Sequence, residues 1–242
     1  MPGLGRRFVT IRGILFDKDG TLLDYWKTWV PINREAALFA AGGDAVLADE
    51  LLRHGGHDPS TNHVASGSVL AVGSHDEIAA VFSARLGSSA PPNLAKSIER
   101  IFREGGARHS VLIDGVQEVI ADLGRRGYRL GVATNDSAGG LQASLEVHRL
   151  LDKFDFLAGC DSGFGVKPEP GMALAFCQAT GLHPSAIAVV GDAVHDLEMG
   201  RRAGVGSKVG VLSGTAARED LAPHADVLIG SVANIAAYLT AP

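Results

Sequence analysis

Short apolar runs alternate with amphipathic segments over most of the chain. Runs of apolar and β-branched residues, typical of buried strands, occupy residues 10–16, 128–133, 154–158, 186–190, 205–211 and 225–229. Apolar residues at helical spacing occupy residues 116–126, 141–150, 170–180, 196–203 and 232–239. Because alternating strands and helices build a parallel sheet covered on both faces, this pattern predicts an α/β fold with a doubly wound, Rossmann-like sheet.

The segment between the first predicted strand and residue 110 shows a different pattern. Apolar residues recur there at helical spacing over residues 26–41, 45–54, 75–86 and 93–103, and no strand pattern interrupts them. We therefore predict a catalytic core formed by residues 1–22 and 110–242, with an inserted all-helical cap formed by residues 23–109. Ligands of such sheets bind beyond the carboxyl ends of the strands, so an insertion at this point can act as a lid.

Composition and charge narrow the classes of protein that fit. The 242 residues hold 22 Lys and Arg against 27 Asp and Glu, a net charge of −5, so we expect no nucleic-acid partner. No stretch of about 18 apolar residues is present, so we expect no membrane span. The two cysteines lack the spacing of a zinc site and are expected to be buried apolar groups in a reducing, cytoplasmic setting. The oligomeric state is not indicated by any feature of the sequence.

Polar residues follow three of the predicted strands at the point where each strand ends. They are Asp17 and Asp19, Thr134 and Asn135, and Gly191 and Asp192. The carboxyl ends of parallel strands meet at one edge of a sheet, so we expect these groups to lie close together. Clustered carboxylates repel one another unless a hard divalent cation neutralises them, and oxygen ligands suit Mg²⁺. The sequence therefore predicts a Mg²⁺ site at this edge.

Four motifs, in order along the chain, carry a family resemblance. They are the FDKDGTL segment at residues 16–22, Thr134-Asn135, Lys167-Pro168 and the GDAVHD segment at residues 191–196. Together they resemble the motifs of the haloacid dehalogenase-like hydrolase superfamily, and in overall layout its helical-cap, phosphoglycolate phosphatase-like subgroup. The predicted helical insertion lies where that subgroup carries its cap.

The resemblance implies a phosphatase, and the chemistry of the residues agrees with it. Asp17 would attack phosphorus as the nucleophile and form an aspartyl-phosphate, while Asp19 would donate a proton to the leaving group and later accept one from water. The cofactor implied is Mg²⁺, held by Asp17, the backbone carbonyl of Asp19 and Asp192, with Asp196 bound directly or through water.

The resemblance also implies a phosphate-binding set. Thr134 would offer its hydroxyl and Asn135 a backbone N–H to the phosphate oxygens. Lys167 would supply a positive charge that also pairs with the carboxylates.

Asp19 separates this prediction from several alternatives. Haloacid dehalogenases lack the second acid of the first motif, P-type ATPases carry Thr there, and phosphonate hydrolases carry a small residue. A sugar phosphomutase would use the same two acids, although Thr21 resembles phosphatases more than mutases. A protein that binds a phosphorylated ligand without catalysis is the alternative from another class, and it would be expected to have lost one of the acids.

The cap sequence carries the prediction of substrate preference. We expect a small phosphorylated metabolite, of the phosphoglycolate or sugar-phosphate type. Trp29 and His54 are the predicted specificity residues, although an aromatic stripe such as Tyr25, Trp26 and Trp29 more often packs into a core. Asp136 is expected to point outward as a helix cap. An inward orientation would instead favour a substrate that bears a cation.

Overall fold

A six-stranded parallel sheet forms the centre of the molecule. The computed structural model describes residues 10–239, so the predicted ends of the core at residues 1–9 and 240–242 lie outside the described residues. The strand order is β5-β4-β1-β6-β7-β8, and every neighbouring pair is parallel. The strands are β1 (Gly13–Phe16), β4 (Arg129–Ala133), β5 (Phe156–Ala158), β6 (Ile187–Gly191), β7 (Ser207–Val211) and β8 (Val227–Ile229). The predicted fold class is confirmed.

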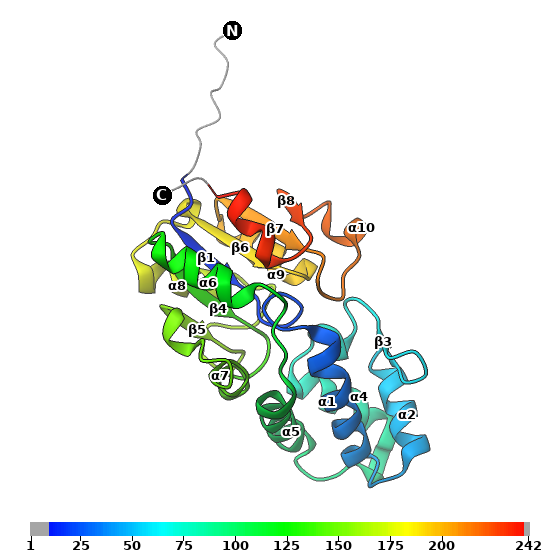
Figure 1. Ribbon diagram of the computed structural model, residues 1–242. Helices are drawn as coiled ribbons and strands as arrows, with labels where there is room; N and C mark the ends of the chain where they lie inside the picture. The colour runs from blue at the N-terminus through cyan, green and yellow to red at the C-terminus, as the bar shows by residue number, and fades with distance from the viewer. Residues whose placement is uncertain (1–9, 240–242) are drawn as a thin grey trace.

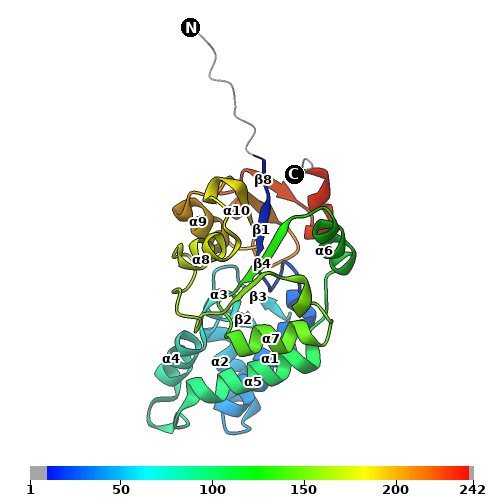
Figure 2. The ribbon, with the colours of Figure 1, turned by 90° about the vertical axis from the view of Figure 1, so that its left-hand side faces the viewer.

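Apolar side chains fill both faces of this sheet, which explains why its strands appear in the sequence as nearly unbroken apolar runs. In β1, Ile14 and Phe16 belong to one cluster of buried side chains and Leu15 belongs to another. The first cluster includes α6 (Val116–Arg125) and α7 (Ala138–Glu146), and the second includes α8 (Gly171–Thr180) and α9 (Val194–Ala203). Figure 2 shows α6 and the pair α8 and α9 on opposite sides of β1 and β4.

The shorter elements of the core account for most differences from the predicted pattern. They are α10 (Arg218–Leu221) and the 3-10 helices η2 (Leu151–Lys153), η3 (Pro184–Ala186) and η4 (Val232–Ala237). The helix predicted over residues 232–239 is present as the shorter 3-10 helix η4. Helix α7 starts three residues before its predicted start because the hydroxyl of Ser137 accepts the Gly140 N–H at 3.0 Å and caps it.

Most of the segment between β1 and residue 110 is helical and lies beyond the carboxyl edge of the sheet (Figure 1). Its helices are α1 (Tyr25–Ala40), α2 (Ala45–His54), α3 (Val69–Val72), α4 (His75–Leu86), the 3-10 helix η1 (Gly87–Ser89) and α5 (Leu94–His109). They surround an apolar cluster of their own. The expectation that no strand interrupts this block is wrong, because the two-residue strands β2 (His57–Asp58) and β3 (His63–Val64) pair antiparallel.

Helix α5 continues six residues past its predicted end and packs against α7 of the core (Figure 2). The paired glycines Gly105 and Gly106 resemble a helix end in the sequence, but the helix passes through both. A side-chain carbon on Gly106 would lie 2.4 Å from Ser144 Oγ, so glycine lets the two helices approach closely. No helix among residues 10–239 is long and apolar enough to cross a membrane.

Candidate active site

Three acids of the first and fourth motifs, Asp17, Asp192 and Asp196, gather at the carboxyl edge of the sheet. Asp17 directly follows β1, and its N–H donates to the carbonyl of Val190 in β6 at 2.8 Å. Asp192 directly follows β6, and Asp196 lies in the first turn of α9. One carboxylate oxygen from each of Asp17, Asp192 and Asp196 lies within 4.8 Å of the other two, and all three residues are buried.

Lys167 joins this cluster from the loop before α8. Its Nζ donates to Asp17 Oδ1 at 2.5 Å and to Asp196 Oδ1 at 2.6 Å. Burial lowers the pKa of Lys167, but the charges of Asp17 and Asp196 outweigh burial and raise the pKa above its usual value. Burial and the neighbouring charge of Asp17 raise the pKa of Asp192 well above its usual value. Burial raises the pKa of Asp196 to about 6, against the opposing charge of Lys167.

Backbone groups fix the two acids that follow β6. The Thr215 N–H donates to Asp192 Oδ2 at 2.9 Å, and the Ala193 N–H donates to Asp196 Oδ2 at 3.0 Å. Asp192 also lies directly against the backbone of Gly214, where a side-chain carbon would come within 1.8 Å of Asp192 Oδ2. A residue other than glycine at this position would displace the carboxylate.

The charges of the cluster fit a divalent cation. Three ionised carboxylates and one ammonium leave a deficit of 3 − 1 = 2 positive charges in a buried place. Burial is the main cause that raises the pKa of Asp192 and of Asp196, and the like charge of Asp17 raises both further. Because the available ligands are carboxylate oxygens, the donor set suits a hard cation such as Mg²⁺ better than a soft one.

Asp19 stands apart from the three clustered acids. Its Oδ1 accepts a hydrogen bond from Trp29 Nε1 at 2.5 Å, and its Oδ2 lies 3.1 Å from Lys18 Nζ. Burial raises the pKa of Asp19 to about 6, against the lowering effect of Lys18. A carboxyl group with this pKa exchanges protons readily near neutral pH, as general acid–base chemistry requires.

The second motif lies beside these acids. Thr134 is buried at the end of β4, and its Oγ1 accepts the Asp136 N–H at 3.1 Å. The side chain of Asn135 holds the Lys167 backbone, because its Oδ1 accepts the Lys167 N–H at 2.9 Å and its Nδ2 donates to the Lys167 carbonyl at 3.3 Å. The same Nδ2 donates to the carbonyl of Val72 in α3 at 3.2 Å, so Asn135 also contacts the helical segment.

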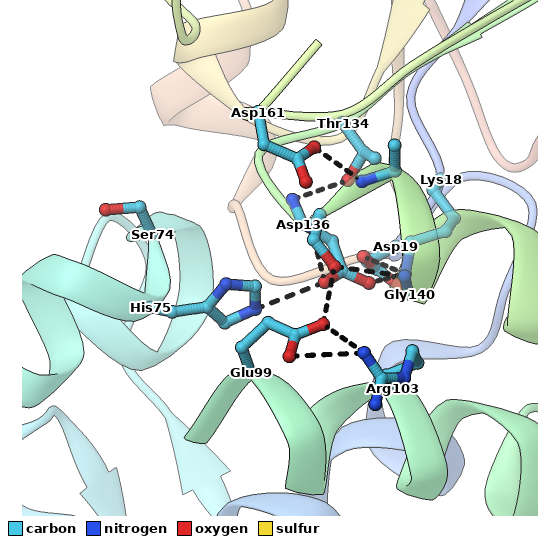
Figure 3. A network of polar contacts seen from close by, with 12 residues as sticks. Lys18, Asp19, Ser74, His75, Glu99, Arg103, Thr134, Asp136, Gly140 and Asp161 are labelled. Carbon is cyan, nitrogen blue, oxygen red and sulfur yellow. Dashed lines mark hydrogen bonds and ion pairs between the residues drawn. The ribbon is translucent and has the colours of Figure 1, made fainter. Parts of the chain in front are cut away.

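A second buried ion-pair network, which sequence reasoning missed, connects Lys18, Asp136 and His75 (Figure 3). Lys18 is fully buried, and its Nζ donates to Asp136 Oδ2 at 2.6 Å. His75, at the start of α4, places its Nε2 3.2 Å from Asp136 Oδ1. Burial alone would raise the pKa of Asp136, but Lys18 and His75 hold it well below its usual range.

The expectation that Asp136 points outward is therefore wrong. Its carboxylate points inward, but it is already paired with Lys18 and contacted by His75 Nε2 and by the Ser137 N–H at 2.7 Å. An unmatched Lys between the two acids of the first motif, together with an unmatched Asp after Asn135, was the only available signal of this pairing in the sequence.

A cavity of about 70 Å³ lies between the sheet edge and the helical segment. The site acids, Lys167, Thr134 and Asn135 line one part of it, and Trp29 lines the part formed by the helices. His54, the other predicted specificity residue, does not line this cavity. It lies at the exposed end of α2, where its Nδ1 contacts the carbonyl of Glu50 at 2.8 Å.

Comparisons with known proteins agree with this geometry. The haloacid dehalogenase-like hydrolase family profile matches residues 14–209. The N-acetylmuramic acid 6-phosphate phosphatase of Pseudomonas aeruginosa is 28% identical over 221 residues, which is 90% of this chain and 90% of that protein. The phosphoglycolate phosphatase of Escherichia coli K12 is 25% identical over 212 residues, covering 82% of this chain and 80% of that protein. The crystal structure of CbbY from Rhodobacter sphaeroides in complex with phosphate has a TM-score of 0.69 and 25% identity, covering 93% of this chain and 96% of that one.

Proposed function

The chain belongs to the haloacid dehalogenase-like hydrolase family and is a phosphatase, and we propose that it uses Mg²⁺ to hydrolyse a small phosphorylated metabolite through an aspartyl-phosphate intermediate. One observation carries the proposal: a buried nucleophile candidate, Asp17, lies beside a lysine and two further acids, with a second carboxyl group, Asp19, on the same short loop. The named relatives act on phosphoglycolate or N-acetylmuramic acid 6-phosphate, which makes phosphoglycolate and sugar phosphates the first candidate substrates.

The first chemical step would be attack by Asp17 on phosphorus. A new bond forms between its carboxylate oxygen and phosphorus, and the bond from phosphorus to the ester oxygen breaks. Asp19 donates its proton to that oxygen, so the leaving group departs as a neutral alcohol. The hydrogen bond from Trp29 Nε1 to Asp19 orients the carboxyl group for this transfer.

Hydrolysis of the aspartyl-phosphate would use the same residues in reverse roles. Asp19, now ionised, accepts a proton from a water molecule that attacks phosphorus, and the bond to Asp17 breaks. Inorganic phosphate and the free Asp17 carboxylate result, which restores the starting state. The two steps balance because the proton that Asp19 gives to the alcohol is replaced by one from water.

The negative charge of the transferred phosphoryl group has to be neutralised by several partners. Lys167 provides a permanent positive charge beside Asp17, and Thr134 offers a hydroxyl. A divalent cation held by Asp17, Asp192 and Asp196 would supply the remaining neutralisation that lets an anionic nucleophile approach an anionic phosphate. Asn135 acts through Lys167, whose backbone it fixes on both sides.

The cavity favours a small substrate. Because a buried water needs roughly 10–15 Å³ of such space, about 70 Å³ holds about five to seven water-sized groups. A phosphoryl group and a few further atoms fill that volume. We propose that the helical segment, residues 23–109, acts as a cap. A larger sugar phosphate requires this segment to move away from the sheet.

The test is phosphate release from a panel of phosphate monoesters with Mg²⁺ and with chelator. The Asp17→Asn protein controls for contaminating phosphatases. We expect release that depends on the metal and is lost in the variant. Rearranged sugar phosphates without free phosphate would identify a mutase instead, and equal release by Asp17→Asn would overturn the covalent mechanism.

A further inference from the structure

The two acids of the first motif are each contacted by a buried lysine of their own. Lys167 Nζ lies 2.5 Å from Asp17 Oδ1, and Lys18 Nζ lies 3.1 Å from Asp19 Oδ2. Lys167 lines the cavity, whereas Lys18 is fully buried and does not line it. The proposed mechanism gives Lys167 a role at the phosphoryl group, but it gives none to Lys18.

The carboxyl group of Asp19 is held through both of its oxygens. Trp29 Nε1 donates to Oδ1 at 2.5 Å, and Lys18 Nζ faces Oδ2. Lys18 Nζ also lies 4.9 Å from the centroid of the Trp29 ring, within the range of a cation–π interaction, so each of the three side chains contacts the other two. A carboxyl group has about four lone-pair positions, so both oxygens of Asp19 keep a position for a proton.

Lys18 is itself held in place from the core. Its Nζ donates to Asp136 Oδ2 at 2.6 Å, and Asp136 is contacted in turn by His75 and by the Ser137 N–H (Figure 3). Buried ion pairs often contribute no more stability than well-packed apolar side chains of similar volume. Stability alone therefore does not account for a lysine at this position, where its ammonium group reaches Asp19 as well as Asp136.

We infer that Lys18 is a positioning residue for Asp19, the proposed acid, and that Asp136 anchors Lys18 in this role. This inference rests on the proposed function and adds a residue to its first step. Lys167 acts at the phosphoryl end of the substrate, whereas Lys18 acts at the leaving-group end, through Asp19. Because Lys18 does not line the cavity, it affects proton transfer and not the charge of the phosphoryl group.

Two small substrates of similar size separate these two effects. When phosphorus is attacked in ethyl phosphate, the electron pair of the breaking bond goes to the ethanol oxygen, which takes the proton of Asp19. Acetyl phosphate releases acetate, a stable anion that needs no proton. Weaker positioning of the acid should therefore slow the hydrolysis of ethyl phosphate selectively. Each molecule is a phosphoryl group with a few further atoms, as the cavity of about 70 Å³ favours.

The quantity to compare is kcat/KM for the two substrates. It reports the steps up to departure of the leaving group, so the later hydrolysis of the aspartyl-phosphate, which both substrates share, does not enter. We expect Lys18→Met to lower kcat/KM for ethyl phosphate at least about tenfold more than for acetyl phosphate. The ratio of the two values does not depend on the fraction of protein that is folded.

Three further variants calibrate this ratio. Asp19→Asn removes the acid itself and should show the same selective loss on ethyl phosphate, to a greater degree. Lys167→Met should lower both values by a similar factor, since the two substrates carry the same phosphoryl group. Lys27→Met is the matched control, because Lys27 is 67% exposed, and it should leave both values unchanged.

The double variant Lys18→Met/Asp136→Asn separates positioning from stability. It no longer buries an unpaired carboxylate, but it does not restore the contact to Asp19. We expect it to keep the selective loss on ethyl phosphate even where its melting temperature is higher than that of Lys18→Met. Hydrolysis of ethyl phosphate that returns together with stability would show that Lys18 acts through folding alone, and would overturn the inference.

Failure of the inference and failure of the proposed function give different results. A selective loss in Asp19→Asn, with an equal loss on both substrates or no loss in Lys18→Met, overturns the inference and leaves the phosphatase in place. Equal losses on both substrates in Asp19→Asn, or release from acetyl phosphate alone by the wild-type protein, overturn the acid role of Asp19 and the inference with it. Release from neither substrate, with Mg²⁺ present, counts against the proposed function itself.

Discussion

Replacing Lys18 with methionine removes the charge at the centre of the second ion-pair network while keeping the length of the side chain. The Lys18 side chain is fully buried, with Nζ 2.6 Å from Asp136 Oδ2 and 3.1 Å from Asp19 Oδ2. The variant leaves the Asp136 carboxylate buried with His75 and one backbone N–H as its remaining partners. We expect a large loss of stability for this reason.

The magnitude follows from the separation and from the partners that remain. Two unit charges 2.6 Å apart interact by about 6 kcal/mol at an effective dielectric constant of about 20. Breaking buried pairs by removing one partner costs about 3–5 kcal/mol. Because Asp136 retains His75, we expect the lower end of that range, about 3 kcal/mol in the free energy of unfolding. For a domain of this size the melting temperature would fall by roughly 6–12 °C.

Thermal unfolding followed by circular dichroism measures this effect, and urea midpoints give an independent value. Lys27→Met is the matched control, because Lys27 forms a 2.9 Å ion pair with Asp24 but is 67% exposed. Its melting temperature should stay that of the wild type. The double variant Lys18→Met/Asp136→Asn should recover part of the loss, since it no longer buries an unpaired charge. A Lys18→Met protein with the same melting temperature as Lys27→Met would refute the reasoning.

Three further predictions test the site. The pKa of Asp136 is held below its unfolded value of about 3.9. The stability advantage of the wild type over Asp136→Asn should therefore be full above about pH 5 and shrink as pH falls through 4. Urea midpoints that differ equally at all pH values would contradict this. Trp29→Phe removes the hydrogen bond to Asp19 and should lower kcat about tenfold, whereas His54→Ala should leave the steady-state kinetics unchanged. Burial and nearby acids raise the pKa of Cys160 to about 11, so mass spectrometry should show it alkylated at pH 7.5 at least about tenfold more slowly than an ordinary thiol.

Much of the core could be predicted from the sequence because its signals are local. A strand buried on both faces appears as an apolar run wherever it lies in the sheet, and a polar turn marks its end. The residues after such runs must meet at one edge, so Asp17 and Asp192 could be placed together before any tertiary contact was known. The helical segment was harder to predict, because β2 and β3 are only two residues long and are held by tertiary contacts instead of a periodic pattern.

Contacts between distant residues account for what the sequence did not show. Lys18 and Asp136 are separated by 118 positions, and each resembles an exposed turn residue in its own context. Their pairing depends on β1 lying beside β4, which brings the residues after both strands together. His54 is the reverse case: a polar residue next to glycines was predicted to determine specificity, and the structure places it at the end of α2, where it does not line the cavity.

Two of the contacts that the helical segment makes with the core, one to Asp19 and one to Asp136, bear on how access to the proposed site and its chemistry are linked. Trp29 of α1 binds Asp19, and His75 of α4 contacts Asp136, whereas the Lys18–Asp136 pair lies wholly within the core. Any movement of α1 and α4 away from the sheet breaks the first two contacts and leaves the third intact. Asp19, the proposed acid–base group, therefore keeps its hydrogen bond to Trp29 only when the helical segment lies against the sheet. If the segment moves as the proposed cap would, opening for substrate exchange and the proposed proton transfer by Asp19 would require different positions of it, and the proton donor would lose its Trp29 hydrogen bond while the site is open to solvent.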